Sequence, residues 1–205
     1  MINMIERTPH LPSLQEQILS GASADALARH LSALTPEARR DECLALAPSA
    51  QRQLWQRCEG RAVRIDDIVP PSTPVGAAVR HLGRNTLPAF KRFEKRFCRP
   101  AEGATELWGY NEGPTRPLVG PGYFICRPTP DDPRGAVVID YERVPPASPE
   151  GWPEVAPNER GLSRFVYAHM HDFLRRVSEH VTIGRAYRHG KDSPNYFVLC
   201  RWDEP

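Results

Sequence analysis

The sequence predicts an α+β protein in which an antiparallel, strongly curved sheet or small β-barrel packs against an N-terminal layer of short helices. The first sixty residues contain repeated helix-capping signals and leucines that share one helical face. From about residue 100 onward, short segments rich in β-branched and aromatic residues alternate with glycine and proline. Together these patterns indicate helices first and an antiparallel sheet second.

The N-terminal helices are predicted from their caps and their apolar spacing. Ser23 is placed to cap a helix in which Leu27, Leu31 and Leu34 fall on one face. Thr35-Pro36-Glu37 then supplies an N-cap, a proline at the first helical position and an acidic residue near the positive end of the helix dipole. Because helices this short need a partner surface, we expect them to pack on the sheet.

The chain divides into two segments that we expect to pack as one unit. The stretch VPPSTP (residues 69–74) is the predicted boundary between an N-terminal helical segment, residues 1–69, and a sheet or barrel domain, residues 75–205. A second helical stretch is expected at residues 75–97, interrupted near Pro88.

Five later segments have the composition of strands. They are residues 106–110, 122–127, 136–144, 181–188 and 196–202. In the third of them, Val137, Ile139 and Tyr141 alternate with more polar neighbours, which predicts one dry face and one wetter face.

The sequence also predicts the connections between these strands. Asp132-Pro133-Arg134-Gly135 fits a type I turn, so the second and third predicted strands should form a hairpin. HGKDSPN (residues 189–195) should join the last two strands through a longer loop. The proline-rich residues 145–161 are interpreted as an ordered loop that crosses one end of the sheet.

Composition excludes several classes of protein. The net charge of +2 is too small to indicate a polyanionic partner for the whole molecule, and the scarcity of lysine beside arginine is typical of a GC-rich bacterial genome. The N-terminus lacks the apolar region of a signal peptide, and we expect no transmembrane segment. The five cysteines form no CxxC pair, which favours reduced thiols and a cytoplasmic location.

The segment FVYAHMHDFLRRVSEH, residues 165–180, is the first candidate for chemistry. His169 and His171 would share a face of a strand but would lie about 200° apart on a helix. The apolar spacing favours a short helix from residue 169 or 170 to 178, with Asp172 and Arg176 paired at i, i+4. We therefore expect the two imidazoles to diverge, and we assign no metal ligand.

A metal-assisted enzyme that uses the region of His169, His171 and Asp172, or His180, remains an alternative. It requires His180, His81 or His189 to fold back onto one of the first two histidines. No catalytic motif of a known spacing supports it, no pair of carboxylates can be selected for acid–base chemistry, and no cofactor is expected.

A basic amphipathic helix is expected at residues 89–99. Phe90, Phe93 and Phe97 would form its apolar stripe, on which the helix would pack against the core. Its outer face would carry a basic surface made by Lys91, Arg92, Lys95 and Arg96. Docking on anionic lipid or nucleic acid through these residues is a further alternative function.

Glycines alternate with aromatic residues between residues 107 and 124. Glycine in a strand lets a ligand or another chain segment approach closely, so neighbouring aromatic side chains are candidates to line a cavity, or to fill it. The candidate ligand-binding residues are Trp108, Tyr110, Tyr123, Phe124 and Tyr141.

The C-terminal segments 172–177, 181–186 and 196–201 resemble the ends of small lipocalin-like (calycin) barrel proteins, in which a strand that carries a glycine precedes a final strand ending in an apolar run and arginine. The GxW signature of lipocalins is absent from the expected place. The resemblance implies a closed or half-closed antiparallel barrel whose mouth admits a small apolar ligand.

The leading hypothesis is therefore a cytosolic, non-catalytic binding protein whose sheet encloses an apolar or lipid-like small molecule. It depends on the strand pattern, the aromatic and glycine-rich strands, and the lack of catalytic motifs.

Overall fold

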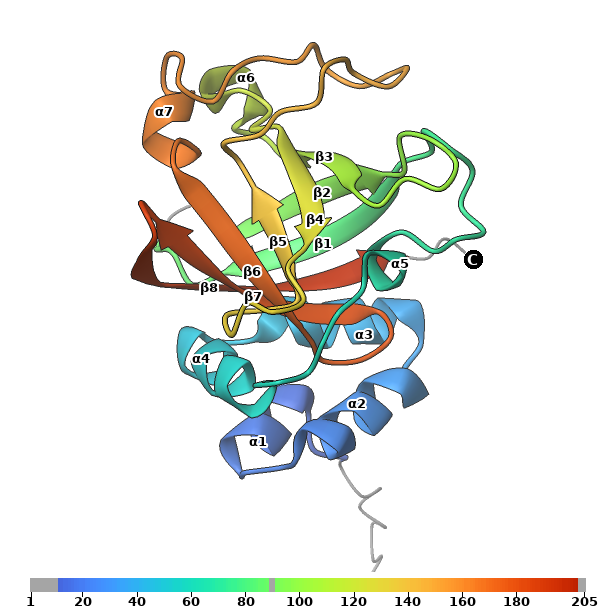
Figure 1. Ribbon diagram of the computed structural model, residues 1–205. Helices are drawn as coiled ribbons and strands as arrows, with labels where there is room; N and C mark the ends of the chain where they lie inside the picture. The colour runs from blue at the N-terminus through green and yellow to red at the C-terminus, as the bar shows by residue number, and fades with distance from the viewer. Residues whose placement is uncertain (1–10, 89–90, 203–205) are drawn as a thin grey trace, which may run out of the picture.

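The computed structural model describes residues 11–88 and 91–202, which form seven helices and eight strands (Figure 1). The helices are α1 (Leu14–Leu19), α2 (Ala24–Ala33), α3 (Pro36–Ala45), α4 (Pro48–Arg57), α5 (Ile65–Ile68), α6 (Arg116–Val119) and α7 (Ser163–Val166). The strands are β1 (Val79–Asn85), β2 (Arg92–Cys98), β3 (Leu107–Glu112), β4 (Phe124–Pro128), β5 (Val137–Asp140), β6 (Met170–Arg176), β7 (Val181–Arg188) and β8 (Lys191–Trp202). No helix in the described ranges is both long and apolar enough to cross a membrane.

The eight strands close into an antiparallel barrel. Each strand pairs with the next along the chain, and β8 returns to pair with β1. The barrel confirms the predicted antiparallel, strongly curved sheet, and the pairing of β4 with β5 confirms the predicted hairpin. Only His189 and Gly190, both with positive φ, separate β7 from β8, so the longer loop expected there is wrong.

Helices α1 to α4 form a layer against the outer face of β7 and β8 (Figure 1). Leu27 and Leu31 are fully buried and belong to the same apolar core as Val198 of β8. The Ser23 and Thr35 side chains accept hydrogen bonds from backbone amides of the first helical turn, as predicted. The caps start these helices, and the barrel wall supplies the partner surface that they need.

The two ends of the barrel differ. At one end, the segment 63–69, which includes α5, packs against the interior ring of Phe97 and closes the barrel. Residues 145–161 run across the opposite end near α6 and α7 (Figure 1), where Asn158 Nδ2 donates to the carbonyl of Tyr141 over 2.7 Å. This proline-rich connection is an ordered loop, as the sequence predicts.

The second helical stretch expected at residues 75–97 is wrong. Residues 79–85 are β1 and residues 92–98 are β2, so the basic helix expected at 89–99 is a strand; Ala89 and Phe90 lie outside the described residues. The physical reason is that β2 alternates: Phe93, Lys95 and Phe97 face the barrel interior. A lysine between two phenylalanines that face the interior hides the alternation of apolar and polar residues that would predict a strand.

The helix expected to start near residue 169 is also a strand. Met170, Asp172 and Leu174 of β6 face the interior, whereas His171 and Phe173 face outward. An aspartate on the apolar face breaks the alternation that would otherwise predict a strand.

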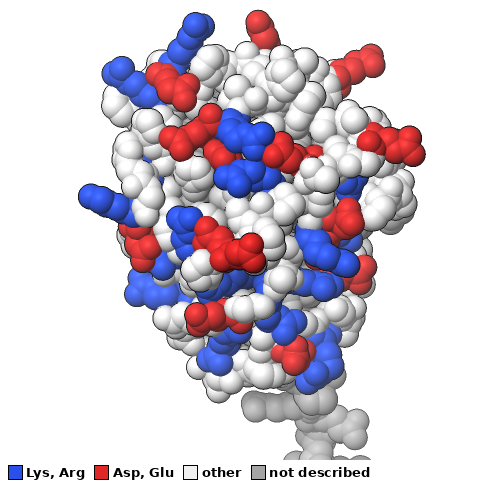
Figure 2. All heavy atoms as spheres, in the orientation of Figure 1, with Lys and Arg blue, Asp and Glu red and all other residues white. Residues whose placement is uncertain are grey.

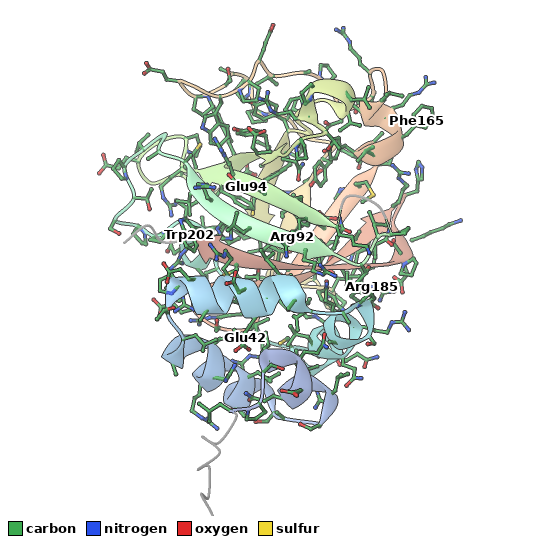
Figure 3. The ribbon with its side chains drawn as sticks, turned by 180° about the vertical axis from the view of Figure 1, so that it is seen from behind. Glu42, Arg92, Glu94, Phe165, Arg185 and Trp202 are labelled. Atoms are coloured by element: carbon green, nitrogen blue, oxygen red, sulfur yellow. The ribbon has the colours of Figure 1, made fainter. Side chains whose placement is uncertain are left out.

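Glu94 joins neighbouring strands on the outer face of β2 (Figure 3). Arg80 donates two hydrogen bonds to it, at 3.1 and 3.0 Å, and Arg96 donates one at 2.7 Å. Burial by itself raises the pKa of Glu94, but these hydrogen bonds outweigh it, and the pKa lies below its ordinary value.

A lowered folded-state pKa contributes stability above the unfolded-state pKa, and this contribution is lost as the pH falls through the folded-state pKa. We expect Glu94→Gln to lower the free energy of unfolding at pH 7 and to converge with the unmodified chain below about pH 4. Urea unfolding of both proteins between pH 7 and pH 3 measures this. A difference that does not change with pH would contradict the assignment.

Candidate functional site: a cavity at the open end of the barrel

A cavity of about 220 Å³ lies at the end of the barrel opposite α5. Its wall comes from the ends of the strands, and its rim comes from α6, α7 and the connection after β1. The interior side chains that line it are Phe93, Lys95, Tyr141, Met170, Asp172 and Phe197. The barrel interior is therefore packed in one half and open in the other.

The polar floor of this cavity is an ion pair between two buried residues. Lys95 is 3 % exposed and Asp172 is 5 % exposed, and Lys95 Nζ lies 3.4 Å from Asp172 Oδ2. Lys95 also donates to Asn111 Oδ1 over 2.9 Å and to the hydroxyl of Tyr141. An ammonium group has three donors, so these three acceptors satisfy Lys95.

Asp172 is less completely satisfied. Its Oδ1 is buried and accepts no hydrogen bond from any described residue, whereas Oδ2 faces Lys95. Burial raises the pKa of Asp172 and lowers the pKa of Lys95, and in each case the charge of the other residue opposes the shift. The pair therefore persists because each member compensates for the burial of the other.

Four aromatic rings surround the ammonium group. Lys95 Nζ lies 5.0 to 5.5 Å from the ring centroids of Phe93, Phe124, Tyr141 and Phe197. Each ring presents an electron-rich face at a distance at which cation–π attraction operates. The rings thus stabilise the charge, and three of them (Phe93, Tyr141 and Phe197) also form the apolar wall of the cavity.

Three strand glycines make room for three of these rings. Gly83, Gly109 and Gly184 are the cross-strand partners of Phe93, Phe124 and Phe197, respectively. A Cβ atom on any of them would lie within 2.1 to 2.5 Å of the facing ring. Because the glycines have no side chain, the rings lie back against the wall and leave the centre of the barrel to Lys95.

The predicted ligand-binding residues are separated by the barrel wall. Tyr141 lines the cavity, and Phe124 lies inside the barrel in its apolar core. Tyr110 and Tyr123 do not line the cavity; they pack with Trp152 of the proline-rich loop, at ring-centroid distances of 4.8 and 6.4 Å. Trp108 shares the outward face of β3 with Tyr110.

The predicted basic surface is also divided. Lys91 and Arg92 are exposed and Arg96 pairs with Glu94, but Lys95 is inside the barrel, so its assignment to the surface is wrong. Figure 3 shows Arg92 and Glu94 on the same strand. On the opposite face, shown in Figure 2, positive and negative side chains are interspersed rather than segregated.

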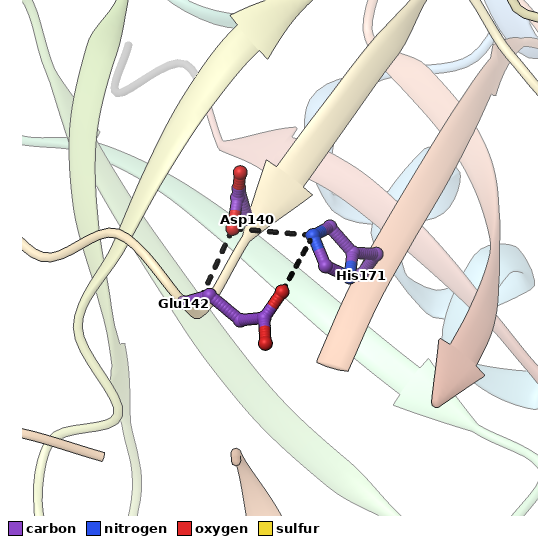
Figure 4. Close-up of side chains that lie close together, drawn as sticks. All are labelled: Asp140, Glu142 and His171. Carbon is purple, nitrogen blue, oxygen red and sulfur yellow. Dashed lines mark hydrogen bonds and ion pairs between the residues drawn. The ribbon is translucent and has the colours of Figure 1, made fainter. Parts of the chain in front are cut away.

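A second polar cluster lies on the outside of the barrel wall (Figure 4). His171 Nε2 is 3.3 Å from Asp140 Oδ1 and 3.5 Å from Glu142 Oε2. The hydrogen bond with Asp140 raises the pKa of His171, against the effect of its partial burial. His169 Nδ1 contacts the other oxygen of Glu142 over 2.9 Å, so the expectation that the two imidazoles diverge is wrong.

The remaining histidines take different positions. His189 stacks on His169 with ring centroids 4.4 Å apart, whereas His180 contacts Arg201. His81 lies 3.0 Å from the carbonyl oxygen of Ile68, remote from this cluster. Of the three histidines that the metal-enzyme alternative expects near His169 or His171, only His189 lies there, and Asp172 faces the interior, away from both.

The fold and the site define a closed eight-stranded antiparallel barrel with one end plugged and a small amphipathic cavity at the other. Comparison with protein-family models, with curated proteins and with solved structures finds no match.

The pairing of Lys95 with Asp172 was not predicted from the sequence, which placed Lys95 on a basic surface and Asp172 in the segment of the metal-enzyme alternative. The sequence did contain one signal. In each of the two segments, β2 and β6, one charged residue occupies a position where an apolar side chain is expected. Each residue by itself favoured a helix; only their proximity across the barrel shows that they are partners.

Replacement of Gly184 tests the packing of the rings. Gly184→Ala should destabilise the protein by about 1–3 kcal/mol, because the new methyl group overlaps the ring of Phe197. The double variant Gly184→Ala/Phe197→Leu should recover part of this loss. Thermal and urea unfolding measure both; equal stability of Gly184→Ala and the unmodified chain would contradict the close approach.

Replacement of the ion pair tests its energetics. Lys95→Met or Asp172→Leu alone should cost about 3–5 kcal/mol, because each leaves one buried charge without its partner. The double variant Lys95→Met/Asp172→Leu should be more stable than either single variant. Additive losses in urea unfolding would show that the two residues do not interact.

Proposed function

We propose that this protein is a cytosolic, non-catalytic binding protein that encloses a small, mostly apolar molecule in the open half of its barrel. The single observation that carries the proposal is the cavity itself, which has aromatic walls and a buried polar floor with one unpaired acceptor. Binding sites for small molecules have this composition: largely apolar, with a few placed polar groups that orient the ligand.

The volume of the cavity limits the size of the ligand. A cavity of about 150 Å³ accommodates benzene. At about 220 Å³, this cavity suits an enclosed portion on the order of ten non-hydrogen atoms. This volume favours a compact ring system as the ligand. A long acyl chain would not fit inside along its whole length, so a lipid-like ligand would have to be short or only partly enclosed.

The polar floor specifies which end of the ligand enters first. Lys95 has no spare donor, whereas Asp172 Oδ1 is an unused acceptor. Because Oδ1 is itself buried, a ligand whose deep end carries a neutral hydroxyl or N–H donor would satisfy that oxygen once the Asp172 side chain turns toward the cavity. The charge of Asp172 would repel an anionic head group, and the charge of Lys95 would repel a cationic one.

The rim supports entry of an apolar molecule. Leu87, which follows β1, and Val166 of α7 line the cavity and are 38 % and 40 % exposed; Leu118 of α6 and Phe165 of α7 lie on the same rim elements and are 70 % and 62 % exposed. Figure 3 shows Phe165 at the outer edge of this end of the molecule. Exposed apolar groups around an opening mark a surface that apolar molecules contact.

Two further observations agree with the proposal. The closed eight-stranded barrel is compatible with the lipocalin-like resemblance of the C-terminal segments. All five cysteines are buried thiols outside any disulfide, which suits the reducing conditions of the cytosol. The basic-surface alternative is weakened, because Lys95 is not available to a docked polyanion.

A matched pair of ligands tests the proposal. 1-Naphthol and 1-methylnaphthalene have the same shape, but only the first carries a hydroxyl donor. We expect calorimetry to show binding of both, with 1-naphthol tighter by about tenfold because a hydrogen bond to a charged group contributes about 1.5–3 kcal/mol. Native mass spectrometry and organic extraction of the purified protein would then identify the natural ligand.

Two variants serve as controls. The Lys95→Met/Asp172→Leu protein should keep affinity for 1-methylnaphthalene and lose the preference for 1-naphthol. Ala186→Leu adds a side chain that projects from the lining of the cavity and should abolish binding of both. Binding of both probes weaker than about 1 mM, or unchanged in Ala186→Leu, would overturn the proposal.

A further inference from the structure

We propose that Asp140, Glu142 and His171 form a binding site for a divalent first-row transition-metal ion on the outer wall of the barrel. This site is separate from the ligand cavity and does not depend on the proposed function. Its three side chains come from the end of β5, from the residue pair that follows it, and from β6 (Figure 4).

The spacing of the three ligand atoms fits one ion. Atoms bound at about 2.0–2.2 Å in a tetrahedral arrangement lie about 3.3–3.6 Å from one another. His171 Nε2 lies 3.3 Å from Asp140 Oδ1 and 3.5 Å from Glu142 Oε2, and all three ligand atoms lie within 4.8 Å of one another. An ion between them therefore requires only small side-chain adjustments.

The donor set selects the class of ion. One imidazole nitrogen with two carboxylate oxygens suits Zn²⁺ and its first-row neighbours, whereas Mg²⁺ and Ca²⁺ prefer oxygen ligands alone. Three protein ligands leave a fourth position open, and Glu142, with a 47 % exposed side chain, places that position toward solvent.

Outer partners already orient two of the ligands. Arg127 donates two hydrogen bonds, both of 3.2 Å, to Asp140 Oδ2, whereas Oδ1 faces His171 and also accepts a hydrogen bond from the backbone amide of Glu142 over 3.1 Å. His169 Nδ1 holds Glu142 Oε1 and so leaves Oε2 directed at His171. Such contacts around the ligands hold metal sites in shape.

The backbone supports this placement. Among the described residues other than glycine, only His169 and His189 have positive φ, at 59° and 51°. Their rings stack beside Glu142, and the amide of His189 donates to the carbonyl of His169 over 3.0 Å. This unfavourable backbone conformation places the imidazole of His169 against the carboxylate.

The experiment uses the purified chain without a polyhistidine tag, freed of metal with a chelator and then titrated with Co²⁺. We expect one Co²⁺ per chain, with the visible absorption bands of a four- or five-coordinate ion, and displacement by Zn²⁺. Elemental analysis after dialysis against Zn²⁺ measures the stoichiometry independently.

Three variants measure how much each side chain contributes to Co²⁺ binding. His171→Ala and Glu142→Gln should each weaken Co²⁺ binding more than His169→Ala, for which a loss of roughly 10–100-fold is expected. His30→Gln is the matched control, because His30 and Glu42 form a histidine–glutamate pair at 2.8 Å elsewhere in the chain; it should not change binding. Circular dichroism checks that each variant folds. Absence of a stoichiometric ion, or equal binding in Glu142→Gln and the unmodified chain, would falsify the assignment.

Discussion

The ion pair between Lys95 and Asp172 is the constraint on which the rest of the barrel interior depends. Two charges at the centre of a barrel are costly unless they are paired, hydrogen-bonded and surrounded by polarisable groups. Here the pairing crosses the barrel from β2 to β6, and four aromatic rings enclose the ammonium group. On the neighbouring strands, glycines, which have no Cβ atom, leave the space that three of those rings occupy.

The same pair separates the two halves of the barrel. On one side of it, apolar side chains and the α5 segment fill the interior; on the other, the cavity opens between α6 and α7. A fully apolar interior would favour continued packing, because empty apolar space loses dispersion contacts. A polar floor with an unused acceptor at Asp172 favours an open half instead, because a buried acceptor without a partner is costly.

Strands β5 and β6 serve two sites at once. Tyr141 faces the cavity between Asp140 and Glu142, which face outward, and His171 faces outward between Met170 and Asp172, which line the cavity. The alternation of a strand places the proposed ligand site and the proposed metal site on opposite faces of one wall. Both sites therefore depend on the same registration of β5 against β6.

The sequence by itself determined the N-terminal helices, the β4–β5 hairpin and the curved antiparallel sheet, because caps, turns and alternation are local signals. Val137, Ile139 and Tyr141 alternate as expected and all face the interior. What only the tertiary structure decided is the identity of β1, β2 and β6. Lys95 and Asp172 each look wrong for a buried strand, and each becomes favourable only beside the other, through a contact between residues 77 positions apart. No local pattern contains that contact, so the residues that obscured the strands are also those that form the site.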